Sequence, residues 1–457
     1  MKNSKTNYSY IEGIVYSKQF RNLQDKTQLF YSAPKRQVRT RLTHTIEVKI
    51  IAQNIGQKIN RKYKKRILDL NLIDAIALAH DIGHTPFGHV GERTIDEIVS
   101  KKDTLGGLIC DNYDSKMRFK HNVNSMRILE ELDIKDWRII DGALCHTRIF
   151  YKNDNVNYSI NPYNPFEEKT NKIRDFIYAE HDILTNHRKK PHSLTLEGQI
   201  VAVADEIAQR VADISDGLES RYFEKIQKIL GVEEKLHTHA ELEQFIRSSL
   251  INDVVSNTIN NLKQHSPQFL VNSGISHTVY YQEIVSFSES MKTKNNELEE
   301  YITTIMAQSE VVRESDSRSK YIIRQLFKAY LNDVSLLPDE FIDSYFGKII
   351  NKKSFQAAIR ALENEQSNDE NAQMIDVLYK IHKQSWKIDK WNLPQNIVVI
   401  RMDLVKKYFD LLRLIMRNSQ RTELNLLFDE YILKVGFYIA SLTNSEAFNA
   451  YNRIYGH

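Results

Sequence analysis

A short stretch, Ala79 to Glu92, constrains this chain more than any other part of its sequence. It holds three histidines, one aspartate, one glutamate and three glycines within 14 residues. It overlaps the end of an apolar run, Leu72 to Ala79, which predicts a buried helix. A buried helix that ends in His80 and Asp81 presents a neutral nitrogen ligand and an anionic oxygen ligand at one point. This pairing suits a borderline divalent metal such as Mn, Fe, Co, Ni or Zn.

The second half of this stretch holds further ionisable groups. If the helix continued through Gly83, His84 would share the face of the histidine that precedes it by four residues. Pro86 would then end this helix and begin another. On that second helix, His89 and Glu92 are three residues apart and would also share a face.

Length and composition set the outer limits. The 457 residues suffice for a large core or for two or three domains. With 15 Gly and 8 Pro, the composition favours helices over many short strands. No apolar run approaches the roughly 18 residues of a membrane span, and the N-terminus lacks an apolar signal core. Because only Cys110 and Cys145 occur, we expect no disulfide framework and a cytoplasmic protein without membrane contact.

Two other predicted helices carry groups that could join the His-Asp pair. Residues 41–59 have helical apolar spacing, with His44 on this helix and Arg41 one turn earlier. A single helical histidine is usually structural, and His44 becomes a ligand candidate only if another helix brings the pair to it.

The spacing of apolar residues in 196–217 predicts a second buried helix, which carries a polar stripe. Its polar residues follow at steps of four, four and three: Asp205, Gln209, Asp213 and Asp216. A buried carboxylate is costly without a cation, and a metal at Asp205 would supply one. The alternative is that this stripe simply faces solvent.

The rest of the sequence points less specifically to a function. His121, near the start of a predicted helix, points either into a pocket or into solvent, and we interpret His146 as structural. Residues 57–66 hold six basic side chains, which form either a solvated helix end or a contact for a polyanion. From about 220 to 457 the pattern is helical, and we identify no cluster of ligand residues in its last third.

Four residues stand out as one ligand set: His44, His80, Asp81 and Asp205. Their order resembles the signature of the HD superfamily of metal-dependent phosphohydrolases. The flanking stretches 20–30, 38–44, 80–92 and 204–217 resemble the bacterial dGTPase-like deoxynucleoside triphosphate triphosphohydrolases. Weaker similarity at 336–341 and 438–456 extends the resemblance over nearly the whole chain.

The resemblance implies an all-α fold and a specific reaction. Residues 1–220 would form the HD-domain helical core with an N-terminal nucleotide-binding segment, and residues 221–457 an additional helical region. The reaction would be hydrolysis of dNTPs, dGTP among them, to deoxynucleoside and tripolyphosphate. The four ligands would hold one divalent ion (Mn, Mg, Fe, Co, Ni or Zn), which would polarise an α-phosphate oxygen. A homo-oligomer, with a nucleotide or single-stranded DNA as effector, is also implied.

Matching positions supply expected roles for individual residues. The candidates for proton handling or for contact with the leaving group are His84, His89, Glu92 and His121. The expected substrate contacts are Arg41 with phosphate, Gln24 near sugar and base, and Asp213 with the deoxyribose 3′-OH. Gln209, also a substrate-contact candidate, stands where the family usually has a nucleotide-contacting Tyr. Three further positions, Glu206, Phe437 and Asn444, replace aspartates that are common in the family. These departures affect the nucleotide pocket and leave the metal ligands unchanged.

Two alternative functions stay open at this point. One is another HD-type nucleotide phosphohydrolase, acting on a monophosphate or on a cyclic or signalling nucleotide; the extended motif through Glu92 argues against it. The other is a nucleotide-sensing or nucleic-acid-sensing protein with reduced catalysis. Gln209 and the basic run motivate this reading, and the complete ligand set argues against it.

Overall fold

The computed structural model describes most of the chain, and it divides into two compact units that alternate along the sequence. The described residues are 7–27, 39–63, 66–109, 117–147, 192–217, 222–232, 236–272, 275–280, 282–349, 360, 369–383, 403–410 and 422–456. The first unit takes residues 1–89, 121–160 and 172–318, and the second takes 90–120, 161–171 and 319–457. The division predicted near residue 220 stays a prediction.

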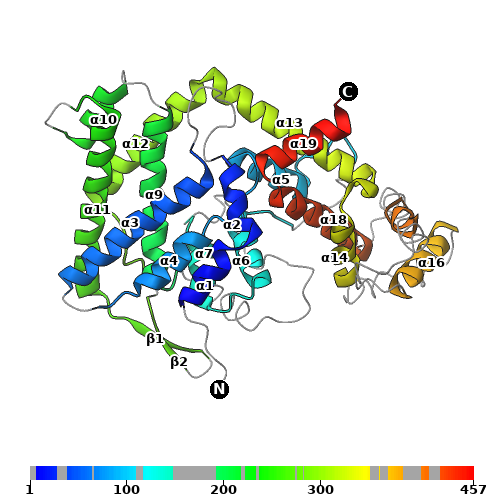
Figure 1. Cartoon of the computed structure of the whole chain (residues 1–457), viewed down its shortest axis with the longest axis horizontal. Coiled ribbons are helices and arrows are strands. Elements are labelled where there is room, and N and C mark those ends of the chain that lie inside the picture. The colour runs from blue at the N-terminus through cyan, green and yellow to red at the C-terminus, as the bar shows by residue number, and fades with distance from the viewer. Residues whose placement is uncertain are drawn as a thin grey trace. The chain divides into compact units, whose positions relative to one another are not determined.

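The first unit is built from helices and one hairpin (Figure 1). Its elements are α1 (Asn7–Val15), α2 (Lys18–Asn22), the 3₁₀ helix η1 (Leu23–Asp25), α3 (Arg41–Lys62), α4 (Leu70–Ala79), α6 (His121–Glu131), α7 (Trp137–Cys145), α9 (Leu196–Gly217), α10 (Phe223–Leu230), α11 (His239–Gln264), β1 (Gln268–Asn272), β2 (Ile275–Val279) and α12 (Glu289–Gln308). Two helices run from this unit into the second, α5 (Gly88–Val99) and α13 (Glu310–Asn332).

The centre of the first unit is the packing of α3, α4, α7, α9 and α11 against one another. Apolar residues recur at helical spacing on the buried face of α3, among them Val48, Ile55 and Ile59, whereas Ile46 and Ile50 are exposed. Thr40 begins this helix, because its hydroxyl accepts a hydrogen bond from the Thr43 backbone amide. The helix is therefore fixed at the end that carries its histidine.

Two glycines allow α4, α7 and α9 to approach closely. A Cβ atom at Gly198 of α9 would lie 2.0 Å from Ser193 Oγ and 3.1 Å from Gly142 Cα of α7. A Cβ atom at Gly142 would lie 2.6 Å from Ile76 Cγ2 of α4. Neither position has room for a side chain: α9 approaches the α7 backbone at Gly142, and the Ile76 side chain of α4 packs directly on the same glycine.

The second unit contains the rest of α5 and α13, the 3₁₀ helix η3 (Val334–Leu336), α14 (Asp339–Ile349), α16 (Asp369–Lys383), α18 (Thr422–Ser441) and α19 (Asn444–Tyr455). Its core is rich in aromatic rings. Tyr431 of α18 packs on Phe409 with ring centroids 3.9 Å apart, and its hydroxyl donates to the Tyr330 carbonyl at 2.7 Å. A buried ion pair joins Lys101 Nζ to Asp429 Oδ1 at 3.0 Å.

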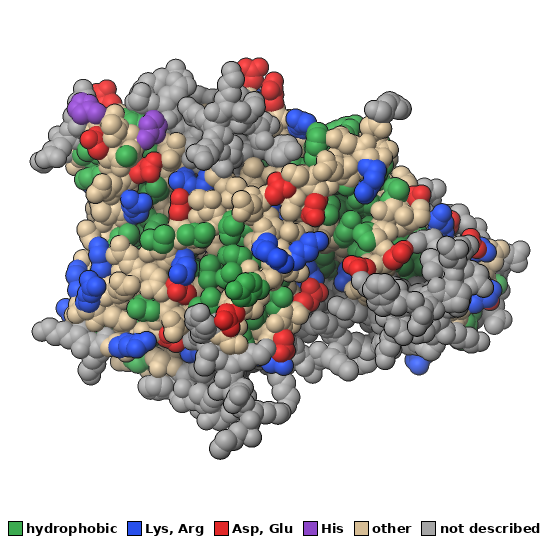
Figure 2. Space-filling view, viewed as in Figure 1, with side chains coloured by type: hydrophobic (Ala, Val, Ile, Leu, Met, Phe, Trp, Pro, Cys, Tyr) green, Lys and Arg blue, Asp and Glu red, His purple; other side chains and the backbone are tan. Residues whose placement is uncertain are grey.

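On the surface, charges of both signs are interspersed on the face that Figure 2 shows. In the predicted basic run, Lys58 donates to Asn252 Oδ1 at 2.9 Å and Lys62 to Ser256 Oγ at 3.4 Å, both on α11. Arg61 is exposed, and residues 64–65 lie outside the described residues. Among the helices of the described ranges, none combines the length and apolar character that crossing a membrane requires.

The predicted all-α fold is confirmed, with one local exception. The β1–β2 hairpin pairs residues 268–272 with 275–279 in antiparallel register, inside a region predicted to be helical. It is the only sheet in the described part of the chain.

Replacing Gly198 by Ala tests the close helix packing. We expect Gly198→Ala to lower the free energy of unfolding by about 2–4 kcal/mol, because the added methyl group overlaps Ser193 and approaches the α7 backbone. The matched control is Gly13→Ala in α1, where the nearest atom, Ile134 Cδ1, is 3.7 Å from the new Cβ. This control should be neutral or stabilise by about 0.5–1 kcal/mol. Urea unfolding followed by circular dichroism measures both, and equal stability of the two variants would contradict the packing argument.

Candidate active site

Three helices of the first unit bring a pair of imidazoles and a carboxylate together. His44 lies in the first turn of α3, His80 caps α4, and Asp205 lies midway along α9. His44 Nε2 is 2.8 Å from Asp205 Oδ1, and His80 Nε2 is 3.7 Å from the same oxygen. One potential ligand atom from each of the three lies within 4.8 Å of the others. The condition set for His44, that another helix bring the His-Asp pair to it, is met in the structure.

The hydrogen bond of His80 determines which of its nitrogens faces this cluster. Its Nδ1 lies 2.6 Å from the Ala77 carbonyl, which can only accept, so Nδ1 carries the proton. The lone pair of Nε2 then faces Asp205 and Asp81, each 3.7 Å away. This nitrogen is buried and has no hydrogen-bond partner among the described residues. A lone pair directed at two carboxylates is repulsive unless a cation lies between them.

The distances and donor types fit a divalent metal ion. Two atoms that bind the same ion at about 2.1 Å lie roughly 3 to 3.5 Å apart. The separations of 2.8 to 3.7 Å between His44, His80, Asp81 and Asp205 bracket this value. Two imidazole nitrogens and two carboxylate oxygens suit a borderline metal, and a cation would compensate the buried negative charge. The group is therefore a candidate metal-binding cluster of the kind that the sequence predicts.

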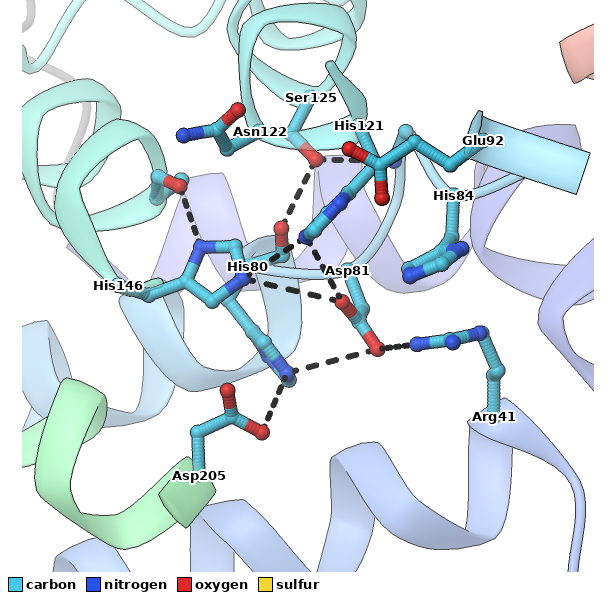
Figure 3. A network of polar contacts seen from close by, with 12 residues as sticks. Arg41, His80, Asp81, His84, Glu92, His121, Asn122, Ser125, His146 and Asp205 are labelled. Atoms are coloured by element: carbon cyan, nitrogen blue, oxygen red, sulfur yellow. Dashed lines mark hydrogen bonds and ion pairs between the residues drawn. The ribbon is translucent and has the colours of Figure 1, made fainter. Parts of the chain in front are cut away.

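The two oxygens of Asp81 have different surroundings (Figure 3). Oδ2 accepts a hydrogen bond from Arg41 Nη1 at 2.6 Å, whereas Oδ1 faces the Nε2 atoms of His121 and His146 at 3.8 and 3.9 Å. Burial raises the pKa of the Asp81 carboxyl, but the positive charge of Arg41, followed by the imidazole of His80, outweighs burial and holds the pKa well below its usual range. Asp81 is thus ionised at neutral pH.

A tight turn after α4 fixes the positions of His80 and Asp81. The helix ends at Ala79 and does not continue through Gly83, so the shared face considered for His80 and His84 is wrong. Ser125 of α6 holds the turn from both sides, because its hydroxyl donates to the His80 carbonyl at 2.8 Å and accepts from the Gly83 amide at 2.9 Å. A Cβ at Gly83 would lie 2.2 Å from the Ser125 backbone nitrogen. Only glycine lets α6 approach so closely.

His84 lies in a buried stack of imidazoles beside the cluster. Its ring stacks on that of His121 with centroids 4.2 Å apart, and lies 5.3 Å from that of His89. Burial, the Arg41 charge and His121 together hold the pKa of His84 well below its usual value. His84 is therefore neutral near pH 7, and its Nε2 has no hydrogen-bond partner among the described residues. A neutral, buried imidazole of this kind can accept a proton.

The other two candidates for proton handling differ in their surroundings. His89 is exposed at the start of α5. Glu92 is buried on the part of this helix that belongs to the second unit, where Lys120 Nζ lies 3.0 Å from its Oε1. Their roles stay predictions.

The predicted substrate contacts are one buried arginine and three polar side chains on η1 and α9. Arg41 is buried, and its Nε and Nη2 have no hydrogen-bond partner among the described residues. Gln24 is exposed in η1, while Gln209 and Asp213 lie one and two turns beyond Asp205 on the same face of α9. The roles of the last three stay predictions, and the side chain of Asp216 lies outside the described residues.

Sequence reasoning missed two polar residues. Arg210 is buried on α9, where Nη1 is 3.6 Å from Asp213 Oδ2 and Nη2 is 3.0 Å from Glu299. His146, interpreted as structural, caps α7 beside Asp81, and burial, followed by His80 and His121, lowers its pKa to about 4. The available signal was its position: like His80, it follows directly after an apolar helix.

The HD domain model matches residues 41–210, and the model of a phosphohydrolase-associated domain matches 285–354. The first range holds the whole cluster of histidines and aspartates described above. The chain therefore carries an HD domain. HD domains depend on metal, which agrees with the His/Asp cluster of this chain.

Several relatives of this chain share the name "Deoxyguanosinetriphosphate triphosphohydrolase-like protein". The protein from Bartonella tribocorum is 28% identical over 375 residues, which cover 76% of this chain and 81% of the relative. Those from Geobacter sulfurreducens and Sinorhizobium medicae are 27% and 29% identical, covering 72% and 73% of this chain and 78% and 79% of the relatives. Together with the HD domain, these similarities identify the chain as a phosphohydrolase.

Asp205→Asn tests the metal cluster. This change removes the charge of a ligand while keeping its size, so we expect the Mn²⁺ concentration that half-maximally raises the Tm to increase at least about tenfold. Thermal unfolding of the metal-stripped protein over a series of Mn²⁺ concentrations measures this. The control Asp133→Asn alters an exposed carboxylate near Lys135 and should respond like the wild type. A wild-type response of Asp205→Asn would remove this residue from the cluster.

Proposed function

We propose that this phosphohydrolase hydrolyses deoxynucleoside triphosphates, dGTP among them, to deoxynucleoside and tripolyphosphate. His44, His80, Asp81 and Asp205 would hold one divalent ion, whose identity among Mn, Mg, Fe, Co, Ni and Zn is open. The names of the relatives, which are similar over more than two thirds of this chain, support this substrate class. The observation that carries the proposal is that the buried guanidinium of Arg41 has unpaired hydrogen-bond donors among the described residues.

Arg41 is a buried cation whose hydrogen bonds are incomplete. It is 2% exposed, and among the described residues only its Nη1 has a hydrogen-bond partner, Asp81 Oδ2, at 2.6 Å. Two unpaired donors on a buried guanidinium are costly unless a ligand accepts from them. Phosphate oxygens match the fork of a guanidinium and bring the negative charge that it needs. Arg41 would thus hold a phosphate group against the His/Asp cluster.

The surrounding residues fit hydrolysis at such a phosphate. When bound, a divalent ion polarises a phosphate oxygen and so assists attack by water. Water attacks the α-phosphorus, the bond to the nucleoside 5′-oxygen breaks, and this oxygen takes up a proton. Neutral His84 is placed to accept the proton of the attacking water, and His89, Glu92 and His121 are the other candidates for proton handling.

Recognition of base and sugar would fall to Gln24, Gln209 and Asp213. Gln209 offers an amide where a tyrosine ring is usual in the resembling family, so contact through stacking is replaced by hydrogen bonding. Base preference would then differ from that of a tyrosine-bearing site. Homo-oligomer formation, regulation by a nucleotide or single-stranded DNA, and a cytoplasmic location stay predictions.

Product identification tests the reaction. Incubation of the full chain with each of the four dNTPs and Mn²⁺ or Mg²⁺ should release deoxynucleoside and tripolyphosphate in equal amounts, separated by ion-exchange chromatography. His80→Ala and Asp81→Ala should each lower turnover at least about a hundredfold, because even outer partners of metal ligands are worth 10–100-fold. Pyrophosphate and a nucleoside monophosphate as products would reject the reaction, and turnover of monophosphates or cyclic nucleotides would favour another HD-type phosphohydrolase.

Arg41→Met tests the phosphate contact. Loss of the charged donors should weaken binding of tripolyphosphate about 10-fold to 100-fold in calorimetric titration, because hydrogen bonds to charged groups contribute about 1.5–3 kcal/mol. The control is Arg61→Met, an exposed arginine on the same helix, which should bind as the wild type does. If both variants bind tripolyphosphate with wild-type affinity, Arg41 does not contact phosphate.

A further inference from the structure

One buried lysine of the first unit is bonded to two residues that the proposed reaction uses. Lys26 directly follows η1, is 3% exposed, and donates from Nζ to the His84 carbonyl. Its own carbonyl accepts from the Arg41 amide at 2.8 Å. We infer that Lys26 is a positioning residue, which holds the proton acceptor His84 and the phosphate-binding Arg41 in place relative to each other. This role rests on the proposed function and adds a residue to it.

The backbone of Lys26 fixes the start of α3. Its extended conformation, with φ −123° and ψ 125°, turns the chain out of η1. An isolated antiparallel bridge then pairs Thr27 with Thr40, the residue that caps α3. The first amides of a helix have no partner inside it, and the Lys26 carbonyl supplies one for the amide of Arg41. The segment that carries Gln24 is thereby bonded to the helix that carries Arg41.

The ammonium group of Lys26 fixes the turn after α4 at a point that α6 does not hold. The peptide group before the His84 side chain is held by α6, because Asn124 Nδ2 donates to the Gly83 carbonyl at 2.8 Å. Lys26 holds the next carbonyl along the chain, which is that of His84 itself. The peptide groups on both sides of His84 are therefore bonded, and together they determine the direction of its imidazole.

The free energy of burying an ammonium group indicates that Lys26 does more than fill space. A charged lysine is costlier to bury than a methionine, whose unbranched side chain has a similar length. An apolar residue would therefore serve packing alone. A charged donor, however, makes a stronger hydrogen bond to a carbonyl than a neutral donor does. Lys26 thus holds the carbonyl firmly at some cost in stability, as expected where a shift of about 1 Å can lower the rate 100-fold.

Both partners of Lys26 also contact Asp81 (Figure 3). Arg41 Nη1 donates to Asp81 Oδ2 at 2.6 Å, and the His84 amide donates to the Asp81 carbonyl at 3.0 Å. A fixed spacing between His84 and Arg41 keeps the attacking water near the phosphate that Arg41 holds, which is the geometry that hydrolysis needs. Loss of the ammonium group should slow this step. It should leave phosphate binding intact, because the Arg41 side chain keeps its own bond to Asp81.

A pair of lysine variants tests this role. Lys26→Met removes the ammonium group and keeps a side chain of similar length. The matched control, Lys294→Met in α12, removes the same kind of bond, which runs from Nζ to the Leu230 carbonyl at 2.9 Å. With the dNTP that the wild type turns over fastest, we expect Lys26→Met to lower kcat about 10-fold to 100-fold and to keep KM within about threefold. The control should keep the wild-type kcat and KM.

Two measurements without turnover accompany the kinetics. In calorimetric titration, Lys26→Met should bind tripolyphosphate within about threefold of the wild-type affinity, unlike Arg41→Met, because it leaves the guanidinium in place. Hydrogen exchange followed by mass spectrometry should be at least about threefold faster at residues 80–85 of Lys26→Met, because the turn opens more often. In Lys294→Met, exchange should change around residues 223–232 and not at 80–85.

Several results would overturn the inference. These are a wild-type kcat in Lys26→Met, a raised KM with unchanged kcat, unchanged exchange at residues 80–85, an equal loss of kcat in Lys294→Met, or a tripolyphosphate affinity as low as that of Arg41→Met. Thermal unfolding checks that each variant folds, and Lys26→Gln, which also lacks the charge, replaces Lys26→Met if that variant does not. A wild type that leaves all four dNTPs intact would reject the proposed function alone. Hydrogen exchange would then decide whether Lys26 positions the His84 turn.

Discussion

Negative charge that is buried beside imidazole lone pairs governs the first unit of this protein. Burial raises the pKa of Asp205, but the hydrogen bond with His44, followed by the imidazole of His80, outweighs burial and holds the pKa well below its usual range. Asp81 is shifted in the same direction, mainly through Arg41. Both carboxyls are thus ionised in the folded state, and the stability they contribute is present above the unfolded pKa of about 3.9 and is lost as the pH falls below it. One buried carboxylate (Asp81), one half-buried carboxylate (Asp205) and one guanidinium leave a negative charge that a divalent ion compensates.

The helices around this charge position the ligands by backbone contacts. Gly142 and Gly198 let α4, α7 and α9 cross closely, and Gly83 lets α6 press on the turn that carries the His-Asp pair. The closest atoms at Gly83 are backbone atoms of α6, and the short Ser125 side chain bonds both sides of the turn, so His80 and Asp81 are held by closely packed, inflexible groups. Such rigidity keeps like groups close together in the absence of an ion, which is what a preorganised metal site requires.

Local signals in the sequence predicted most of this arrangement. The apolar periodicity of α3 and α9 predicted buried helices, and the order of His44, His80, Asp81 and Asp205 predicted their convergence, which the structure shows for the first, second and last as one group. The end of α4 was not predictable from helical spacing, because it is determined by Ser125, which lies more than 40 residues later. The hairpin and the Arg210 network likewise depend on partners distant in sequence.

The interpretation of His146 as structural stays a prediction, but its position in the structure repeats that of His80. Considered alone, a histidine after an apolar helix has no distinguishing pattern. His146, however, makes the same hydrogen bond as His80. In both, the ring at the helix end donates to the carbonyl three residues earlier, at 2.6 Å in α4 and 2.7 Å in α7. This one hydrogen bond satisfies a carbonyl that the helix end leaves open and also fixes the tautomer that directs Nε2 inward. Because α4 and α7 meet where Ile76 packs on Gly142, helix packing sets the 5.0 Å separation of the two ring centroids. A substitution at that crossing would therefore alter the His146–Asp81 spacing without changing either residue.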